Sequence, residues 1–183
     1  MTANFPVVLD ACVLIPMPLA DALLRLAAGP RLYLPKWTDQ IMAEVSRNLQ
    51  ANFGLSPQQA AYRESEIRRH FPEAWVTGYE ELIPSMTNNE KDRHVLAAAV
   101  RSNVEVIVTY NVKHFSQTAL APYSITVQGP SAFLTNLHHL DPKAVIQVLQ
   151  EQAAAIGKPV EYVLDRLRIN APRFVDIIRS SKI

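Results

Sequence analysis

The sequence contains few of the residues that build several common kinds of functional site. It has one cysteine, Cys12, and five glycines among 183 residues. A single cysteine excludes an internal disulfide, and we read Cys12 as a small hydrophobic residue. No Gly-x-Gly-x-x-Gly, Walker or Gly-x-Ser-x-Gly motif is present, and His138-His139 has no partners at the spacing of zinc ligands. The chemistry must therefore depend on other residue types, of which carboxylates are the strongest candidates.

Charge of one sign and long apolar runs are also lacking. The formal net charge is +1, from 18 basic and 17 acidic residues, so any surface for nucleic acid must be local. No apolar run reaches the roughly 18 residues of a membrane span, and Asp10 interrupts the only candidate signal segment. The sequence predicts a soluble, cytoplasmic protein without membrane contact. With 49% hydrophobic and 19% charged residues, it is long enough for one α/β core and a small appendage.

Short apolar segments alternate with helical patterns through the first 130 residues. This alternation is typical of a parallel sheet that is covered by helices on both faces. The predicted strands are 5–9, 31–35, 74–77, 104–109 and 124–127. Residues 11–16 are predicted to form a loop, and helices are predicted at 21–27, 38–49, 56–71 and from the cap Asn88 or Asn89 to about residue 100.

Beyond Pro130 the pattern is helical only, with predicted helices at 131–139, 141–156, 159–167 and 172–178. We place a domain boundary near Asp141-Pro142, giving an α/β domain at 1–140 and a C-terminal helical extension at 141–183. The extension has seven Lys or Arg residues against five acids. It is predicted to hold substrate phosphates, to form a groove for a protein partner, or to act as a helical cap that completes the core.

Three acids stand beside core-facing segments, and each has a simpler explanation as well. Asp10 directly follows the first strand, where parallel sheets bind ligands. Asp92 lies in the first turn of a helix, where it could complement the helix dipole. Glu44 lies at the edge of a buried helical stripe and could pair with Arg47. If the three converge, they would offer the oxygen ligands that Mg²⁺ prefers in a site for cleaving phosphodiesters.

Four segments in order resemble the PIN-domain ribonucleases. They are VLDACVL at 8–14, a segment at 37–49 that begins with WTD, contains EV and ends with RNL, KDRHVLAAA at 91–99 and VIVTYNVK at 106–113. The sequence more narrowly resembles the subgroup with the KDRHVLAAA signature, which includes the VapC-type toxins of toxin–antitoxin systems. The likeness spans about residues 5–134, and the helical tail also looks like the C-terminal extension of that subgroup.

The resemblance implies a Rossmann-like three-layer α/β/α sandwich and a metal-dependent endoribonuclease, with 1–140 as the nuclease domain. It implies that Asp10, Glu44 and Asp92 bind Mg²⁺ or Mn²⁺. Its implied partners are RNA, a cognate antitoxin and a second copy of the chain in a homodimer. The fourth catalytic position is held by Asn111, where the general family commonly has aspartate. The RNA contacts are predicted to be Arg47, Arg93, Lys113 and His114, together with the basic helix at 63–70.

Asn111 and His114 keep two other functions open. The narrower subgroup often combines Asn at the fourth position with an acid three residues later, and His114 occupies that place here. A neutral amide should weaken the binding of a second cation, so we expect at most one well-held metal ion in the absence of RNA. The alternatives to a ribonuclease are a PIN-fold RNA- or protein-binding module with weakened catalysis, and a phosphatase-like enzyme that uses the same acids.

Overall fold

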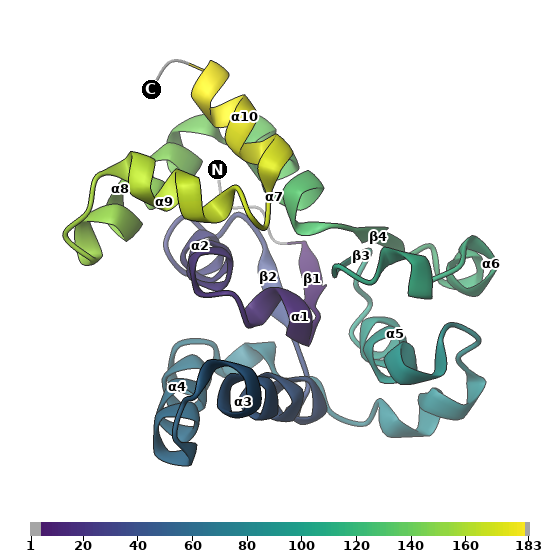
Figure 1. Cartoon of the computed structure of the whole chain (residues 1–183). Coiled ribbons are helices and arrows are strands. Elements are labelled where there is room, and N and C mark those ends of the chain that lie inside the picture. The colour runs from purple at the N-terminus through teal and green to yellow at the C-terminus, as the bar shows by residue number, and fades with distance from the viewer. Residues whose placement is uncertain (1–4, 182–183) are drawn as a thin grey trace.

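Four parallel strands form the centre of the computed structural model, which describes residues 5–181 (Figure 1). The strands are β1 (Pro6–Leu9), β2 (Leu34–Lys36), β3 (Val106–Val108) and β4 (Thr126–Gln128). Their order in the sheet is β2-β1-β3-β4, and Val8 of β1 pairs with Lys36 on one side and Ile107 on the other. The β-branched and leucine side chains of β1 and β3 are almost all fully buried, as expected for a sheet covered on both faces.

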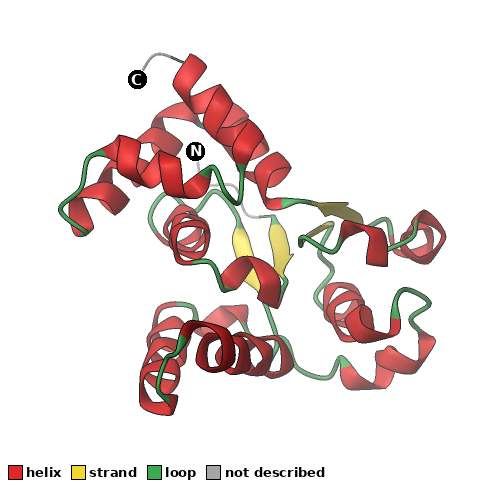
Figure 2. Ribbon diagram, in the orientation of Figure 1, coloured by secondary structure: helices red, strands yellow, loops and turns green. Residues whose placement is uncertain are grey.

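Helices cover both faces of this sheet, so the fold is the predicted α/β/α sandwich (Figure 2). On one side, α5 packs on β1 and β3 and α1 packs on α3, whereas α2 packs on β2 and on the C-terminal helices. The α-helices of the α/β part are α1 (Ala11–Leu14), α2 (Met17–Ala28), α3 (Asp39–Phe53), α4 (Pro57–His70), α5 (Arg93–Arg101) and α6 (Gln117–Leu120). Short 3-10 helices are η1 (Pro72–Ala74), η2 (Glu80–Ser85), η3 (Glu90–Asp92), η4 (Val112–His114) and η5 (Ala121–Tyr123).

The predicted helix starts are confirmed at several caps. The Thr38 hydroxyl accepts a hydrogen bond from the Ile41 N–H at 3.1 Å, which fixes the start of α3. Ser56 and Gln59 form a reciprocal capping box at the start of α4. Asn89 caps η3, and α5 follows directly from it. The caps at Thr38 and Asn89 orient the helices that carry Glu44 and Asp92.

Two sequence predictions of local structure are wrong. Residues 11–16 are not all loop, because the Asp10 carboxylate accepts the Ala11 N–H at 2.7 Å and starts the short helix α1. Residues 74–77 are not a strand, since only Trp75 bridges to Trp37. The reason is that η1 occupies the chain before Trp75, and Gly78 turns the chain afterwards with a φ of +69°.

The second strand is also shifted from its predicted place. Arg31 has a φ of +48°, and the Leu32 N–H donates to the Leu26 carbonyl at 3.0 Å, so this segment still closes the end of α2. Pairing with β1 starts only at Leu34, whose N–H donates to the Phe5 carbonyl at 2.9 Å.

Four helices follow the sheet, as predicted. They are α7 (Pro130–Leu140), α8 (Pro142–Ala155), α9 (Val160–Leu167) and α10 (Pro172–Ser180). α10 packs on α7, and α8 and α9 pack on α2. Their apolar faces join the same hydrophobic core as the sheet. No helix within residues 5–181 has the length and apolar character needed to span a bilayer.

Candidate active site

Asp10 lies at the carboxyl end of β1, with its carboxylate held by three donors. The side chain is only 3% exposed. One oxygen accepts the Ala11 N–H, and the other accepts the Thr109 hydroxyl at 2.6 Å and the Cys12 thiol at 3.3 Å. These hydrogen bonds fix the orientation of the Asp10 carboxyl group at the end of the central strand.

Thr109 and Cys12 connect Asp10 to the loop after β3. Besides donating to Asp10, the Thr109 hydroxyl accepts the Asn111 N–H at 3.0 Å. The Cys12 sulfur accepts the Tyr110 N–H at 3.3 Å. Burial raises the pKa of the Cys12 thiol to about 12, and the charge of Asp10 adds to this effect. Sequence reasoning did not predict the role of Cys12; its place two residues after Asp10, in the first turn of α1, was the available signal.

Glu44, on the middle of α3, is half-buried beside His94. Burial raises the pKa of its carboxyl group, and the negative charges of Asp10 and Asp92 raise it further. The neighbouring His94 and Arg47 act in the opposite direction. Asp10 and Asp92 therefore lie near enough for their charges to act on Glu44, although the three carboxylates come from three separate segments.

The contact between Glu44 and His94 is close but poorly aligned. The His94 Nε2 atom lies 3.2 Å from a Glu44 carboxylate oxygen, which is within ion-pair distance. The same nitrogen is buried and makes no hydrogen bond of acceptable geometry among the described residues. We regard the pair as a close contact and not as a hydrogen bond, because a hydrogen bond weakens steeply when its angle is poor.

Asp92 lies at the junction of η3 and α5, where it is almost fully buried. The His114 Nδ1 atom lies 2.5 Å from its carboxylate, a hydrogen-bond contact that links η4 to this junction. The Asn89 N–H also donates to the His114 carbonyl at 3.0 Å. The structure therefore places His114, a predicted RNA contact, against a predicted metal ligand.

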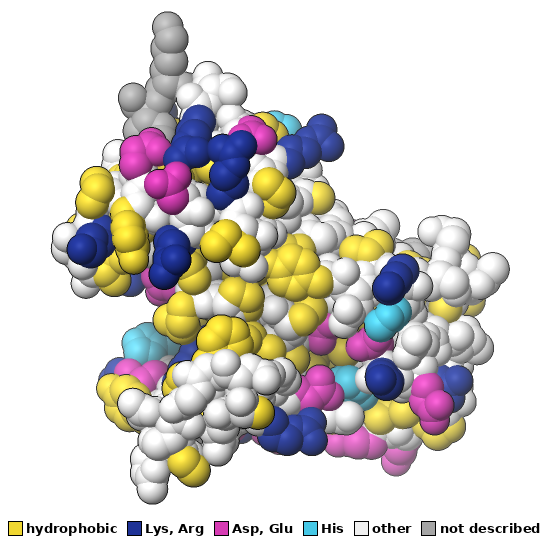
Figure 3. Space-filling model, viewed as in Figure 1, with side chains coloured by type: hydrophobic (Ala, Val, Ile, Leu, Met, Phe, Trp, Pro, Cys, Tyr) yellow, Lys and Arg dark blue, Asp and Glu magenta, His cyan; other side chains and the backbone are white. Residues whose placement is uncertain are grey.

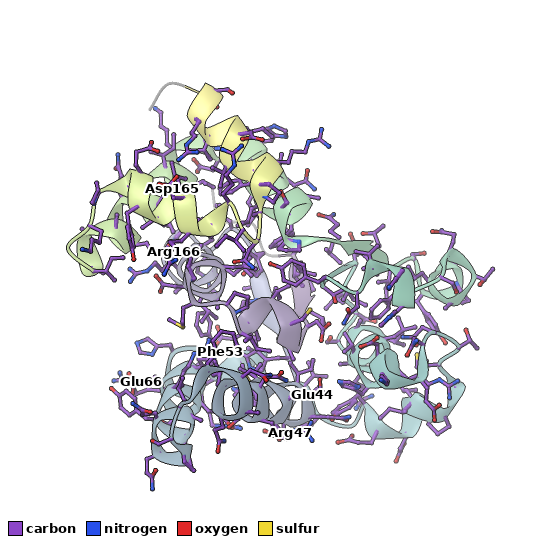
Figure 4. All side chains as sticks on the ribbon, in the orientation of Figure 1. Glu44, Arg47, Phe53, Glu66, Asp165 and Arg166 are labelled. Atoms are coloured by element: carbon purple, nitrogen blue, oxygen red, sulfur yellow. The ribbon has the colours of Figure 1, made fainter. Side chains whose placement is uncertain are left out.

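We call the edge of the sheet with Asp10, Glu44 and Asp92 the acidic edge. The remaining predicted residues lie around it. Asn111 starts η4, and its position is set by the N–H that it donates to Thr109. Arg93 is half-buried and Arg47 and Lys113 are exposed. In Figure 3, magenta, cyan and dark-blue side chains gather beside α3 and α5. Figure 4 labels Glu44 and Arg47 on α3.

The predicted basic surface of α4 is weaker than its sequence indicates. Arg68 forms ion pairs with Asp39 at 2.7 Å and Glu64 at 3.2 Å, and Arg69 pairs with Glu66 at 2.7 Å. These carboxylates offset much of the positive charge. Arg63, by contrast, is directed at the Leu14 carbonyl, to which it donates at 2.7 Å.

The donors at the acidic edge fit a hard divalent cation by their chemistry. They are carboxylate oxygens, and the charges of Asp10 and Asp92 add to the burial that raises the pKa of Glu44, an effect that a cation would offset. Within residues 5–181, however, no three His, Cys, Asp or Glu side chains are grouped closely enough to form a complete metal site. The assignment of Asp10, Glu44 and Asp92 as ligands stays a prediction.

These features define an α/β protein with an acidic edge at the carboxyl ends of parallel strands and a helical C-terminal part. Comparison with known proteins adds two findings of similarity. The sequence model of the VapC50 C-terminal domain matches residues 130–180. A protein of Mycobacterium tuberculosis named "Putative ribonuclease VapC50" is 45% identical over 106 residues.

The match to this relative is partial. It covers 55% of this chain and 62% of the relative's own length. No solved structure matches the chain. The two findings confirm the resemblance to VapC-type proteins that the sequence motifs indicate.

Proposed function

We propose that the chain is a metal-dependent endoribonuclease and acts as the toxin of a toxin–antitoxin pair. The observation that carries the proposal is the hydrogen-bonded Asp10 carboxylate at the carboxyl end of β1, with Glu44 and Asp92 near enough for the charges of the three acids to interact. The similarity to a protein named as a ribonuclease supports it. The expected partners are an RNA substrate, a cognate antitoxin and a second copy of the chain.

In this proposal the three carboxylates hold Mg²⁺ or Mn²⁺. The bound ion would polarise the phosphodiester and promote attack by water. Thr109 and Cys12 fix the orientation of the Asp10 carboxylate, and His114 does the same for Asp92. Such fixed partners prevent the acids from turning toward solvent and keep their oxygens available for the ion.

Other residues of the acidic edge would position the RNA. Arg47, Arg93 and Lys113 provide positive charge for phosphates beside the carboxylates. Asn111 provides a neutral oxygen that can orient a water or a phosphate without adding a fourth negative charge. This set suits one well-held cation in the absence of RNA.

An RNA cleavage assay tests the proposal. We expect the full chain to cleave single-stranded RNA with Mg²⁺ or Mn²⁺ and to stop when EDTA is added. Asp10→Asn should lower the rate by at least about a hundredfold, because a ligand oxygen loses its charge. Asp176→Asn, on the exposed surface of α10, is the matched control and should cleave at the wild-type rate.

The alternatives give different results in the same experiment. A binding module with weakened catalysis would bind the RNA but leave it intact under every metal condition. A phosphatase-like enzyme would turn over a small phosphomonoester instead of RNA. Either outcome would contradict the ribonuclease proposal.

A further inference from the structure

A groove lies between the α3–α4 pair, the segment after α1 and the C-terminal helices. Its volume is about 450 Å³, and its walls include Ile15, Phe53, Arg63, Tyr162, Arg166 and Ile169. Figure 3 shows this hollow between the upper and lower parts of the molecule, with apolar side chains on both sides. In Figure 4, Phe53 lies on the lower helices and Arg166 above it on α9.

Two arginines in the groove have no carboxylate partner within residues 5–181. Arg63 is half-buried, and this burial lowers the pKa of its guanidinium group. It donates to the Leu14 carbonyl and forms no ion pair with any residue that the structure describes. Arg166 is exposed and lies with its guanidinium carbon 5.9 Å from the centre of the Tyr162 ring. A partly buried cation without a counter-charge favours an anionic ligand.

Aromatic rings stand exposed on opposite walls of the same groove. Phe53 is 59% exposed and Tyr162 is 40% exposed. Exposed rings near arginines are the combination that binds single-stranded nucleic acid, because bases stack on the rings while guanidinium groups hold phosphates. The side chain of Ile169, 76% exposed, extends the apolar wall beside them.

The groove is connected to the acidic edge by two elements. The α3 helix carries Glu44 and, nine residues later, Phe53, which places them about 13 Å apart along the helix axis. At the other wall, the Tyr110 hydroxyl donates to the Asn170 carbonyl at 3.3 Å. Because Tyr110 follows Thr109 and Asn170 lines the groove, the loop after β3 joins the acidic edge to the C-terminal wall of the groove.

We propose that this groove binds a single-stranded segment of the RNA beside the cleavage site. Arg63 and Arg166 hold its phosphates, and Phe53 and Tyr162 stack on its bases. The identity of the ligand rests on the proposed ribonuclease function. An acidic peptide would satisfy the arginines as well, but the paired rings and the connection to the acidic edge favour RNA.

The test is RNA binding without cleavage. The probe is a fluorescein-labelled single-stranded RNA of mixed sequence, measured by anisotropy in EDTA. Phe53→Ala should raise the Kd by about tenfold, since one stacked base is lost. Tyr62→Ala is its control, because Tyr62 is an exposed ring on α4 outside the groove and should leave the Kd unchanged.

The salt dependence tests the phosphate contact separately. Arg166→Ala should lower the slope of log Kd against log salt by about 0.7, the value for one phosphate contact on a single strand. Arg173→Ala, which removes an exposed arginine of α10 outside the groove, should keep the wild-type slope. Wild-type binding by both Phe53→Ala and Arg166→Ala would overturn the proposal and leave a protein as the occupant.

Failure of this proposal can be told from failure of the proposed function. If the wild-type chain cleaves RNA with Mg²⁺ while both groove variants bind as it does, the groove assignment is wrong and the function stands. If the wild-type chain binds RNA without cleaving it, and both groove variants bind RNA more weakly than the wild type, the groove assignment is supported and the ribonuclease proposal is wrong.

Discussion

At the scale of single residues, the Cys12 thiol is unusual because it contacts both the first acid and the loop after β3. It donates to Asp10, contacts the Thr109 hydroxyl at 3.3 Å and accepts the Tyr110 N–H. A thiolate at this position would face the Asp10 charge in a buried setting. The protonated thiol is therefore the form that the folded protein stabilises.

This preference predicts a pH dependence. The thiol pKa rises from an ordinary 9.0 to about 12 on folding, so between these values the unfolded chain releases a proton that the folded chain keeps. The Cys12 contribution to the free energy of unfolding should therefore be intact below pH 9 and fall as the pH rises toward 12, by at most about 1.4 kcal/mol per pH unit.

The rate of alkylation by iodoacetamide reports how much of the Cys12 thiol is deprotonated, because Cys12 is the only cysteine in the sequence. Near pH 9 the folded protein should react far more slowly than the protein in urea. In Cys12→Ser, urea unfolding should show a smaller loss of stability with rising pH. A thiol that reacts equally fast in both states would contradict the raised pKa.

The sequence could predict where the acids lie along the chain but not what they contact. Asp10 after a strand and Asp92 near a helix start follow from local patterns of apolar residues. The partners His94 and His114 could not be predicted, since they approach Glu44 and Asp92 across 50 and 22 residues of sequence, respectively. Such contacts depend on how α3, α5 and η4 pack together.

At the scale of elements, α10 acts as a structural helix of the C-terminal part. Phe174 is fully buried, and its N–H donates to the Ser131 hydroxyl of α7 at 3.1 Å. Phe174→Ala should lower the free energy of unfolding by about 3–5 kcal/mol, because a large buried ring leaves a cavity.

Urea unfolding measures this loss of stability, with a variant of the neighbouring residue as the control. Arg173→Ala, one residue earlier and exposed, should change the stability by less than about 0.5 kcal/mol. Equal stability of the two variants would show that α10 is only loosely attached, and that the extension is not part of the core.

Element types followed from the sequence more reliably than their ends. The helices with clear caps, such as α3 and α4, were predicted correctly. The segment 74–77 was not predicted correctly. Its Trp75 side chain packs against Trp37 and Arg68, and the backbone of the segment does not pair with a strand over several residues. Apolar runs of this length fit a strand or a packed loop equally well.

At the scale of the whole molecule, one hydrophobic core runs through the sheet, its covering helices and the C-terminal helices. The predicted boundary at 140 is not a gap in this core, since α8 and α9 pack on α2. That the boundary near residue 140 separates two functions stays a prediction. The extension forms one wall of the groove, while the acidic edge belongs entirely to the preceding part of the chain.

The central claim is that the acidic edge holds one divalent cation through Asp10. A Mn²⁺ titration of the full chain without RNA, followed by the electron paramagnetic resonance signal of the free ion, tests it most directly. We expect one ion bound per chain in the wild type and in Asp176→Asn, and loss of that binding in Asp10→Asn. Unchanged Mn²⁺ binding by Asp10→Asn, or no binding by the wild type, would contradict the claim.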